Sequence, residues 1–317
     1  MSLDHHCTRL PEAIRTMPST TGFLPLDALA ALEFSGADAT TYLQGQLSAD
    51  LRRGTVLSVN YSGIHNPQGR TLARVALAGT ATDGWLAILP AELAPVMAAA
   101  LRRFVLRSRV AINVLPAGCL AVPAGTPPPA DLPERACWLS YPDGRRAAFL
   151  ATGWPAAARG SEDTAEAREE AWRTWQAREV ALGLPEVYAA TSGGFVAQML
   201  NLDCIGAIAF DKGCYTGQEV IARAHYRGKV KRRLQRFAAP APLGLAPGSM
   251  LRLADGRSAQ LVREARLADG SCEFLAVCTL PGASATTGAA ETGAEAPASE
   301  VPAVRSRPLP LPYPLPE

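Results

Sequence analysis

The sequence predicts an α+β protein with more than one domain, and three observations support this fold class. The chain has 317 residues, enough for two or three domains, and its 48% hydrophobic content is sufficient to fill several cores. Candidate helices are few, whereas candidate strands are many and are joined by short turns. This pattern favours antiparallel sheets with a few packed helices over a doubly wound parallel sheet.

Residues 24–115 are predicted to form the first α+β domain. A helix is expected to open at Ser35–Asp38 and to end near Gly45, and a second helix is expected over Glu92–Val105. Residues Asn66–Gly69 form a predicted turn between two of the strands. The predicted strands are Leu29–Phe34, Val56–Tyr61, Thr71–Leu77, Trp85–Leu89 and Val110–Val114.

Residues 116–228 are predicted to form a second α+β domain. It starts with a Pro-rich loop at Thr126–Pro129, and strands are expected at Cys137–Tyr141 and Ala147–Ala151. A long helix is then predicted from about Asp163 to Leu182.

The end of that helix is marked by Gly183, which can take the left-handed C-cap conformation, and by Pro185, which blocks continuation. One face of the helix carries Trp172, Trp175, Glu179 and Leu182. Two tryptophans on one face are typical of a core. Glu179 is the unexpected member, and it must be paired or near solvent because an unpaired buried carboxylate is costly.

Residues 229–280 are predicted to form a small all-β domain, a barrel, with hairpin turns at Asp255-Gly256 and Asp269-Gly270. Its predicted strands are Val230–Phe237, Met250–Leu253, Ser258–Leu267 and Cys272–Thr279. Residues 1–23 are expected to be a flexible N-terminus, and residues 281–317 a low-complexity segment with a Pro-rich, polyproline-like tail. That tail is either a docking strip or a loose end.

Composition excludes several classes of function. The formal net charge of +2 gives no global case for nucleic-acid or membrane binding, and no apolar run is long enough for a membrane span. The seven cysteines contain no C-x-x-C pair, which argues against a disulfide framework and favours a reducing cytoplasm. The four histidines show no metal-ligand spacing, so no metal site is expected.

The stretch from Asp211 to Arg233 carries the most chemical information. It places Cys214 just ahead of a predicted helix, whose Thr216-x-x-Glu219 pattern fits a capping box. The positive end of the helix dipole and the neighbouring Lys212 would both favour thiolate over thiol. We therefore expect a reactive Cys214; the alternative is a buried structural cysteine beside a turn.

The segment Phe195–Leu234 closely resembles the signature of the YgfZ-type folate-binding proteins, relatives of the glycine-cleavage T-protein, which is an aminomethyltransferase. Other motifs agree: Tyr42-Leu43-Gln44-Gly45-Gln46 with Asp50, Asn66-Pro67-Gln68-Gly69-Arg70, Gly183-Leu184-Pro185 and the terminal PLPY. The similarity spans about residues 24–280, and the octet Lys212–Glu219 is highly specific.

This resemblance implies a three-part cloverleaf: two ferredoxin-like α+β domains interleaved in sequence, then a β-barrel, around a central cavity that can hold tetrahydrofolate. It also implies a role in making or maintaining iron–sulphur enzymes, including some that modify tRNA. The residues expected to carry function are Cys214 and Lys212, supported by Gly213, Tyr215, Thr216, Gly217, Gln218 and Glu219. The candidate folate contacts are Trp175, Gln198, Asn201, Arg223, Tyr226 and Arg227.

Some of these residues also have plainer readings. Gly213 and Gly217 would allow a tight turn. Gln218 and Glu219 would orient the loop or cap the helix. Gln198 and Asn201 would contact a pterin-like ring or simply bond within a loop.

The chain departs from the resembled pattern in three places. Ala73 and Arg74 stand where the aminomethyltransferase branch has an acidic pair, so aminomethyl transfer loses its carboxylate. Ala181 replaces a glutamate that can pair with the pterin amino group, and Glu179 is displaced by two residues, about 200° around a helix. Leu29 stands where an aromatic residue can occur.

Three functions follow as alternatives. The first is a monomeric, cytoplasmic accessory protein, rather than a conventional enzyme, which uses Cys214 as a functional thiol or transient iron ligand for iron–sulphur proteins or their assembly factors. The second is a folate-dependent one-carbon transferase. The third is a tRNA-binding module whose basic stripe would be Arg223, Arg227, Lys229, Lys231, Arg232, Arg233 and Arg236. On a strand this stripe would divide between two faces.

Overall fold

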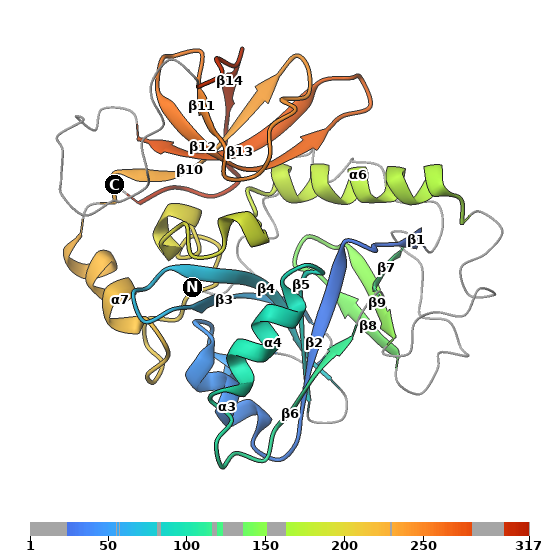
Figure 1. The fold of residues 1–317 in the computed structure, drawn as a ribbon, viewed down its shortest axis with the longest axis vertical. Coiled ribbons are helices and arrows are strands. Elements are labelled where there is room, and N and C mark those ends of the chain that lie inside the picture. Colours follow the sequence, from blue (N-terminus) through green and yellow to red (C-terminus); the bar gives the residue numbers. More distant parts are fainter. Residues whose placement is uncertain are drawn as a thin grey trace.

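The computed structural model describes residues 24–316 except 55, 57, 81–83, 116–118, 123–135, 151–162, 229 and 281–300. It contains three sheets and a few helices (Figure 1). Every strand ladder in the described part of the chain is antiparallel, which confirms the α+β prediction against a doubly wound sheet. The predicted N-terminus, the Pro-rich loop at 126–129 and the segment 281–300 lie outside the described residues.

The first sheet has the order β3-β4-β5-β2-β6. Its strands are β2 (Leu29–Ser35), β3 (Asn60–His65), β4 (Thr71–Gly79), β5 (Trp85–Pro90) and β6 (Ala111–Leu115). Helices α3 (Ala39–Gln46) and α4 (Ala94–Arg102) pack beside it, joined by a hydrogen bond from Tyr42 Oη to the Leu101 carbonyl at 2.6 Å. A short 3₁₀ turn, η1 (Leu51–Arg53), follows α3.

The strand predicted at Val56–Tyr61 is displaced toward the turn and runs as β3 instead. The hairpin explains the shift, because Gly69 N donates to Asn66 O and Asn66 N donates to Arg70 O, which carries both strands up to the turn. Two polar residues of β3, Ser62 and His65, are buried. Ser62 can be buried because its Oγ accepts a hydrogen bond from Ala49 N at 3.0 Å.

The second sheet has the order β1-β7-β9-β8. Its strands are β1 (Leu24–Pro25), β7 (Cys119–Val122), β8 (Ala136–Ser140) and β9 (Arg146–Leu150). The chain therefore enters the second sheet at β1 before it builds the first one, so the two sheets are interleaved in sequence. They meet where Val59 N donates to Ser140 O at 2.8 Å.

Helix α6 (Ala165–Ala181) lies between the third sheet and the second, packed against β12, β13 and β1 (Figure 1). Thr164 caps its start, since the Thr164 Oγ1 accepts from Ala167 N at 3.1 Å. The predicted end is confirmed: Gly183 has φ +65°, and a Cβ there would lie 2.7 Å from a side-chain carbon of Leu311.

The third sheet has the order β11-β12-β13-β10-β14. Its strands are β10 (Arg232–Ala239), β11 (Met250–Arg252), β12 (Ser258–Arg266), β13 (Cys272–Thr279) and β14 (Arg307–Leu309). Both predicted hairpin turns are present, with positive φ at Gly256 and Gly270.

The closed barrel predicted for this part is not confirmed, because the ladders of the described strands leave β11 and β14 as open edges. The C-terminal segment lies across this opening. Arg252 N, in β11, donates to Pro302 O at 2.9 Å, and the chain then pairs with β10 as β14. The described tail is thus docked on its own protein, and its Tyr313 is buried.

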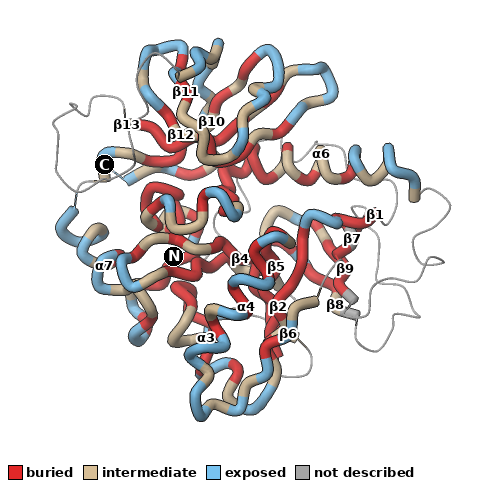
Figure 2. The backbone as a smooth tube through the Cα atoms, viewed as in Figure 1, coloured by how far each residue is buried: buried red, intermediate tan, exposed pale blue. Residues whose placement is uncertain are grey.

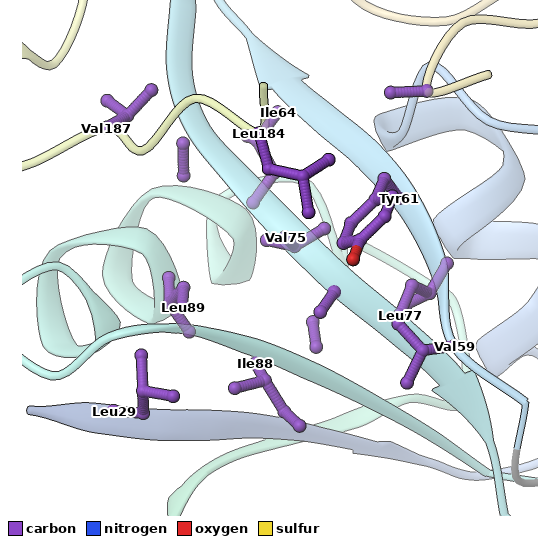
Figure 3. Packing of buried hydrophobic residues seen from close by; sticks show 14 of the residues in the cluster. Leu29, Val59, Tyr61, Ile64, Val75, Leu77, Ile88, Leu89, Leu184 and Val187 are labelled. Atoms are coloured by element: carbon purple, nitrogen blue, oxygen red, sulfur yellow. The ribbon is translucent and has the colours of Figure 1, made fainter. Parts of the chain in front are cut away.

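The main core lies between the sheets and α6 (Figure 2). Strand β4 is buried at almost every position because it has neighbours on both faces. Figure 3 shows Val75 and Leu77 of this strand packing near Tyr61, with Leu184 of the segment after α6 above them. No helix in the described part of the chain is long and apolar enough to cross a membrane.

Candidate functional site at the Cys214 loop

Cys214 lies in the loop that leads into α7 (Gln218–Arg227), and its side chain is exposed. The other five cysteines among the described residues are buried or half-buried. Burial raises the pKa of the Cys119 and Cys204 thiols to about 12, which keeps them protonated. The structure therefore excludes the alternative of a buried structural Cys214 and presents this thiol to solvent.

Lys212 does not point at this thiol; it anchors the loop. Its Nζ donates to the carbonyls of Gln44, Leu47 and Ala49 at 2.8, 2.7 and 2.8 Å. An ammonium has three donor protons, so these acceptors use all of them. Lys212 therefore has a structural role in this loop, and the expectation that its charge assists Cys214 stays a prediction. Burial lowers the pKa of Lys212 to about 8.

The acceptor platform is built by the motif that includes Gln44 and Asp50. Gln44 Nε2 donates to Asp50 Oδ1 at 2.8 Å, and Gln44 Oε1 accepts from Leu51 N at 3.0 Å. These bonds hold the chain after α3 in a tight curve whose carbonyls face Lys212. Hydrogen bonds from Arg52 hold the pKa of Asp50 well below its ordinary value. Two motifs far apart in sequence therefore form one structure.

The turn Asn66–Gly69 supports the other side of the loop. Gly217 has φ +82°, and a Cβ at this position would lie 2.5 Å from Asn66 O. Only glycine fits here, which agrees with the prediction that Gly217 allows a tight turn. A Cβ on Gly213 would meet nothing within 4 Å, so no such contact constrains that position.

The predicted capping box between Thr216 and Glu219 is wrong. Helix α7 begins at Gln218 with Gly217 as its N-cap, and the cap makes no side-chain hydrogen bond. Gln218 orients the loop instead, because its Oε1 accepts from Tyr215 N, ahead of the helix, at 3.3 Å. Thr216 N donates to Gly45 O at 3.3 Å, and Glu219 is exposed.

His65 is a buried residue near the loop that the sequence analysis did not single out. It is 3% exposed, and neither ring nitrogen has a hydrogen-bond partner among the described residues. Its ring centroid lies 6.4 Å from that of Tyr215, and burial lowers the pKa of His65 to about 3. Its position directly before the Asn66–Gly69 turn was the signal available in the sequence.

The six predicted folate contacts fall in three separate places. Trp175 is buried in α6, with the Arg145 guanidinium 4.3 Å from its ring centroid. Gln198, in η3 (Ala197–Leu200), and Asn201 are bonded inside the fold: Gln198 Nε2 donates to Ile221 O at 2.7 Å, and Asn201 Nδ2 donates to Leu234 O at 3.0 Å. The buried Gln198 Oε1 has no hydrogen-bond partner among the described residues. The remaining three are Arg223, Tyr226 and Arg227, on the exposed side of α7.

A buried ionic network occupies the junction of the three sheets. Glu179 of α6 contacts three arginines at 2.8–3.0 Å: Arg74 of β4, Arg145 beside β9 and Arg263 of β12. Arg74 also contacts Glu186 at 2.6 Å. The prediction that Glu179 is either paired or near solvent is resolved in favour of pairing. Although burial alone would raise the pKa of Glu179, the three arginines lower it to about 2.

The network carries more positive than negative charge. Asp143 extends it by contacting Arg145 at 2.6 Å and Arg178 at 2.9 Å, so four arginines face three carboxylates among the described residues. Two buried donor atoms, Arg145 Nη1 and Arg263 Nε, have no hydrogen-bond partner in that part of the chain. The junction therefore offers unused donors to an acceptor group.

The basic stripe predicted for tRNA is not one surface. Arg233 is buried against Asp203 at 2.9 Å, and Arg236 contacts Glu273 at 2.6 Å. Lys229 lies outside the described residues. The sequence showed a run of positive charge, but tertiary partners neutralise two members of it.

Comparison with known proteins shows which proteins this chain is similar to in sequence. The chain is 32% identical over 285 residues to the tRNA-modifying protein YgfZ of Enterobacter sp. (strain 638), across 83% of this chain and 86% of that protein. It is 30% identical over 286 residues to the tRNA-modifying protein YgfZ of Klebsiella pneumoniae (strain 342), with the same shares. No family model matches the chain.

Among solved structures, the chain resembles the glycine cleavage system aminomethyltransferase T from Bartonella henselae. The TM-score is 0.63 at 14% identity, over 88% of this chain and 81% of that one. This likeness shows a shared fold. The relatives above show that the chain belongs to the family of the tRNA-modifying protein YgfZ.

Proposed function

We propose that this protein serves tRNA modification as an accessory to iron–sulphur enzymes and acts through the thiol of Cys214. The observation that carries the proposal is the exposed thiol on a built support. The loop is anchored by the three Lys212 hydrogen bonds and by the close contact of Gly217 with Asn66. The relatives of this protein are named tRNA-modifying proteins, and this name is the reason for proposing that the protein serves tRNA modification.

A single thiol sets the kind of chemistry. Cys214 could ligate a cluster iron transiently, accept a persulfide or reduce an oxidised intermediate. One cysteine cannot hold a cluster, and the described residues contain no group of three or more metal-ligating side chains. The remaining ligands of any cluster would then come from the client protein, which fits an exposed loop.

Aminomethyl transfer is the less favoured function. The resemblance places its catalytic acid where this chain has Ala73 and Arg74. Arg74 is buried and bonded to Glu179 and Glu186, so it brings a fixed positive charge to that position. No free carboxylate stands there to steer an amine.

The second part of the proposal is that a folate-type ligand binds at the junction of the sheets. The residues at this junction fit the acceptor groups of such a ligand but not its pterin amino group. Both Glu179 oxygens accept from arginines, so Glu179 does not fit as the partner of a pterin amino group. The unused donors on Arg145 and Arg263 fit an acceptor, such as a ring carbonyl or a carboxylate. Bound folate would supply one-carbon chemistry.

The role of Cys214 is tested by complementation. We expect a Cys214→Ala variant to fail to restore iron–sulphur enzyme activity in a strain that lacks this protein, whereas Cys137→Ala, at a half-buried cysteine, restores it. Full restoration by Cys214→Ala would rule the proposal out, provided both variants accumulate to wild-type levels.

Folate binding is tested by titrating tetrahydrofolate while recording tryptophan fluorescence. Binding at the junction should change the emission of Trp175, and the change should be absent in a Trp175→Phe variant. If tetrahydrofolate at high concentration causes no change in emission, folate binding is removed from the proposal, and the role of Cys214 is unaffected.

A further inference from the structure

Three aromatic rings gather where the Cys214 loop begins and α7 ends. Phe210 stacks on His225, with centroids 3.8 Å apart and planes 17° apart. Tyr226 stands edge-on to both, at 6.0 Å from Phe210 and 4.8 Å from His225. Tyr226 remains 68% exposed, although an aromatic ring in contact with two others would ordinarily be covered.

Positive charge lies on the same side of the helix. Arg223 and Arg227 are four residues apart and therefore lie on one face, and Tyr226 is three residues from Arg223. Both arginines are exposed, and neither has an ion-pair partner among the described residues. Glu219, the acid of this helix, lies four residues before Arg223 on the same face, in the first turn and about two turns from Tyr226. Figure 2 shows α7 as a largely exposed helix at the edge of the molecule.

We propose that the exposed surface around Tyr226, called the α7 face from here on, binds an unpaired nucleotide of tRNA; Tyr226 lies at its centre, between Arg223 and Arg227 on one side and the Phe210–His225 stack on the other. Proteins recognise single-stranded RNA by stacking bases on exposed aromatic rings and by placing arginines on the phosphates. A duplex hides the base faces, so a stacking surface selects loops and ends. The choice of RNA as ligand rests on the proposed function.

The α7 face lies close to the loop that carries Cys214, and this position indicates what RNA binding would achieve. Phe210 is four residues before Cys214, so their Cα atoms are at most about 14 Å apart. A nucleotide held against Tyr226 would bring tRNA close to the loop that carries the thiol. The accessory protein would then contact the RNA that its iron–sulphur client modifies, in addition to the client itself.

The test measures binding of an unmodified tRNA transcript to the full chain by fluorescence anisotropy. Tyr226→Ala should weaken binding about fivefold to 100-fold, as expected for loss of one stacked base, whereas Tyr226→Phe should keep it. The double variant Arg223→Gln/Arg227→Gln should reduce the slope of log affinity against log salt by about 1.4, since two phosphate contacts of a single strand are lost.

Matched controls come from a remote loop. Phe104 is 55% exposed, and Arg103 and Arg107 beside it are exposed. Phe104→Ala and Arg103→Gln/Arg107→Gln should bind tRNA as the wild type does. Equal losses in both pairs of variants, unchanged binding by Tyr226→Ala, or equal competition by a fully paired RNA would overturn the inference.

One further variant separates this inference from the proposed function. Cys214→Ala should bind tRNA normally, because the thiol is not part of the α7 face. If Cys214→Ala restores iron–sulphur activity while Tyr226→Ala still weakens tRNA binding, the role of the thiol fails and the RNA surface stands. If instead Cys214→Ala fails to restore iron–sulphur activity and Tyr226→Ala binds tRNA as the wild type does, only the RNA surface is disproved.

Discussion

Arg74 and Glu179 meet at 2.9 Å in the interior and join strand β4 of the first sheet to helix α6. The same carboxylate reaches Arg263 on β12, so one buried side chain connects three layers of the molecule. The resemblance implies an acid at or next to the position of Arg74 and a glutamate two residues after Glu179. The two residues that depart from that pattern are thus in contact with each other, and the arginine partly compensates the buried carboxylate.

Removing the arginine should strongly destabilise the fold. An Arg74→Met variant leaves Glu186 without its ion-pair partner and Glu179 with two arginines in place of three, which should cost about 3–5 kcal/mol of unfolding free energy. The double variant Arg74→Met/Glu179→Met should cost less than the sum of the single changes, since the residues interact directly. Urea denaturation measures all three, and strict additivity would contradict the coupling.

The same network predicts an acid-sensitive stability. The pKa of Glu179 is lowered from its ordinary 4.5 to about 2, so its contribution is present above pH 4.5 and is lost as the pH falls toward 2. The loss should be roughly 3 kcal/mol. Burial raises the pKa of Glu186, whose contribution therefore declines above pH 4.5. Asp50, whose pKa is also lowered, contributes in the same acid range, so a Glu179 variant is needed to isolate the share of Glu179.

Unfolding free energies measured at several pH values check this prediction. The Glu179→Gln variant, less stable at neutral pH, should show a much flatter profile between pH 4.5 and 2 than the wild type. Parallel profiles would assign the acid sensitivity to other carboxylates.

The Lys212 anchor should be needed for stability. A Lys212→Met variant leaves the carbonyls of Gln44, Leu47 and Ala49 without their donor, and buried unpaired acceptors should cost about 3 kcal/mol in total. The exposed Arg103→Met serves as the control and should change little. A loss below about 1 kcal/mol in the same urea assay would mean that water replaces the ammonium.

Alkylation of the native protein should select one thiol. Cys214 is exposed, whereas burial raises the pKa of Cys272 and Cys278 to about 11. A Cys7→Ala background removes the N-terminal cysteine, which lies outside the described residues. Mass spectrometry after brief iodoacetamide treatment should then show one modification, absent in Cys214→Ser. Labelling of a buried cysteine first would show that the loop is closed in solution.

The C-terminal tail should contribute measurably to the fold. Tyr313 Oη donates to Gly183 O at 2.7 Å, inside the body of the protein. Tyr313→Phe should therefore cost about 1 kcal/mol, whereas Tyr226→Phe, on an exposed ring, should cost nothing measurable. Equal thermal stability of the two variants would mean that the docked tail is held by packing alone.

The local pattern of the chain determined the element types and many of their bounds. Apolar spacing and turn residues predicted α6, β4, β5 and the hairpins at Gly256 and Gly270, because these features depend on neighbours in sequence. The motifs likewise identified Cys214 as the residue to examine. The charge of a residue, in contrast, did not reveal its surroundings.

Only the tertiary structure decided what the charged and polar residues do. Lys212 bonds to carbonyls some 165 residues away in sequence, and Glu179 pairs with arginines at three separate places in the fold. Such partners are set by how sheets and helices pack, and no local pattern records them. The aromatic cluster on α7 also depends on the stacking of Phe210 on His225, fifteen residues later in the chain, which the fold brings about and the spacing alone does not show.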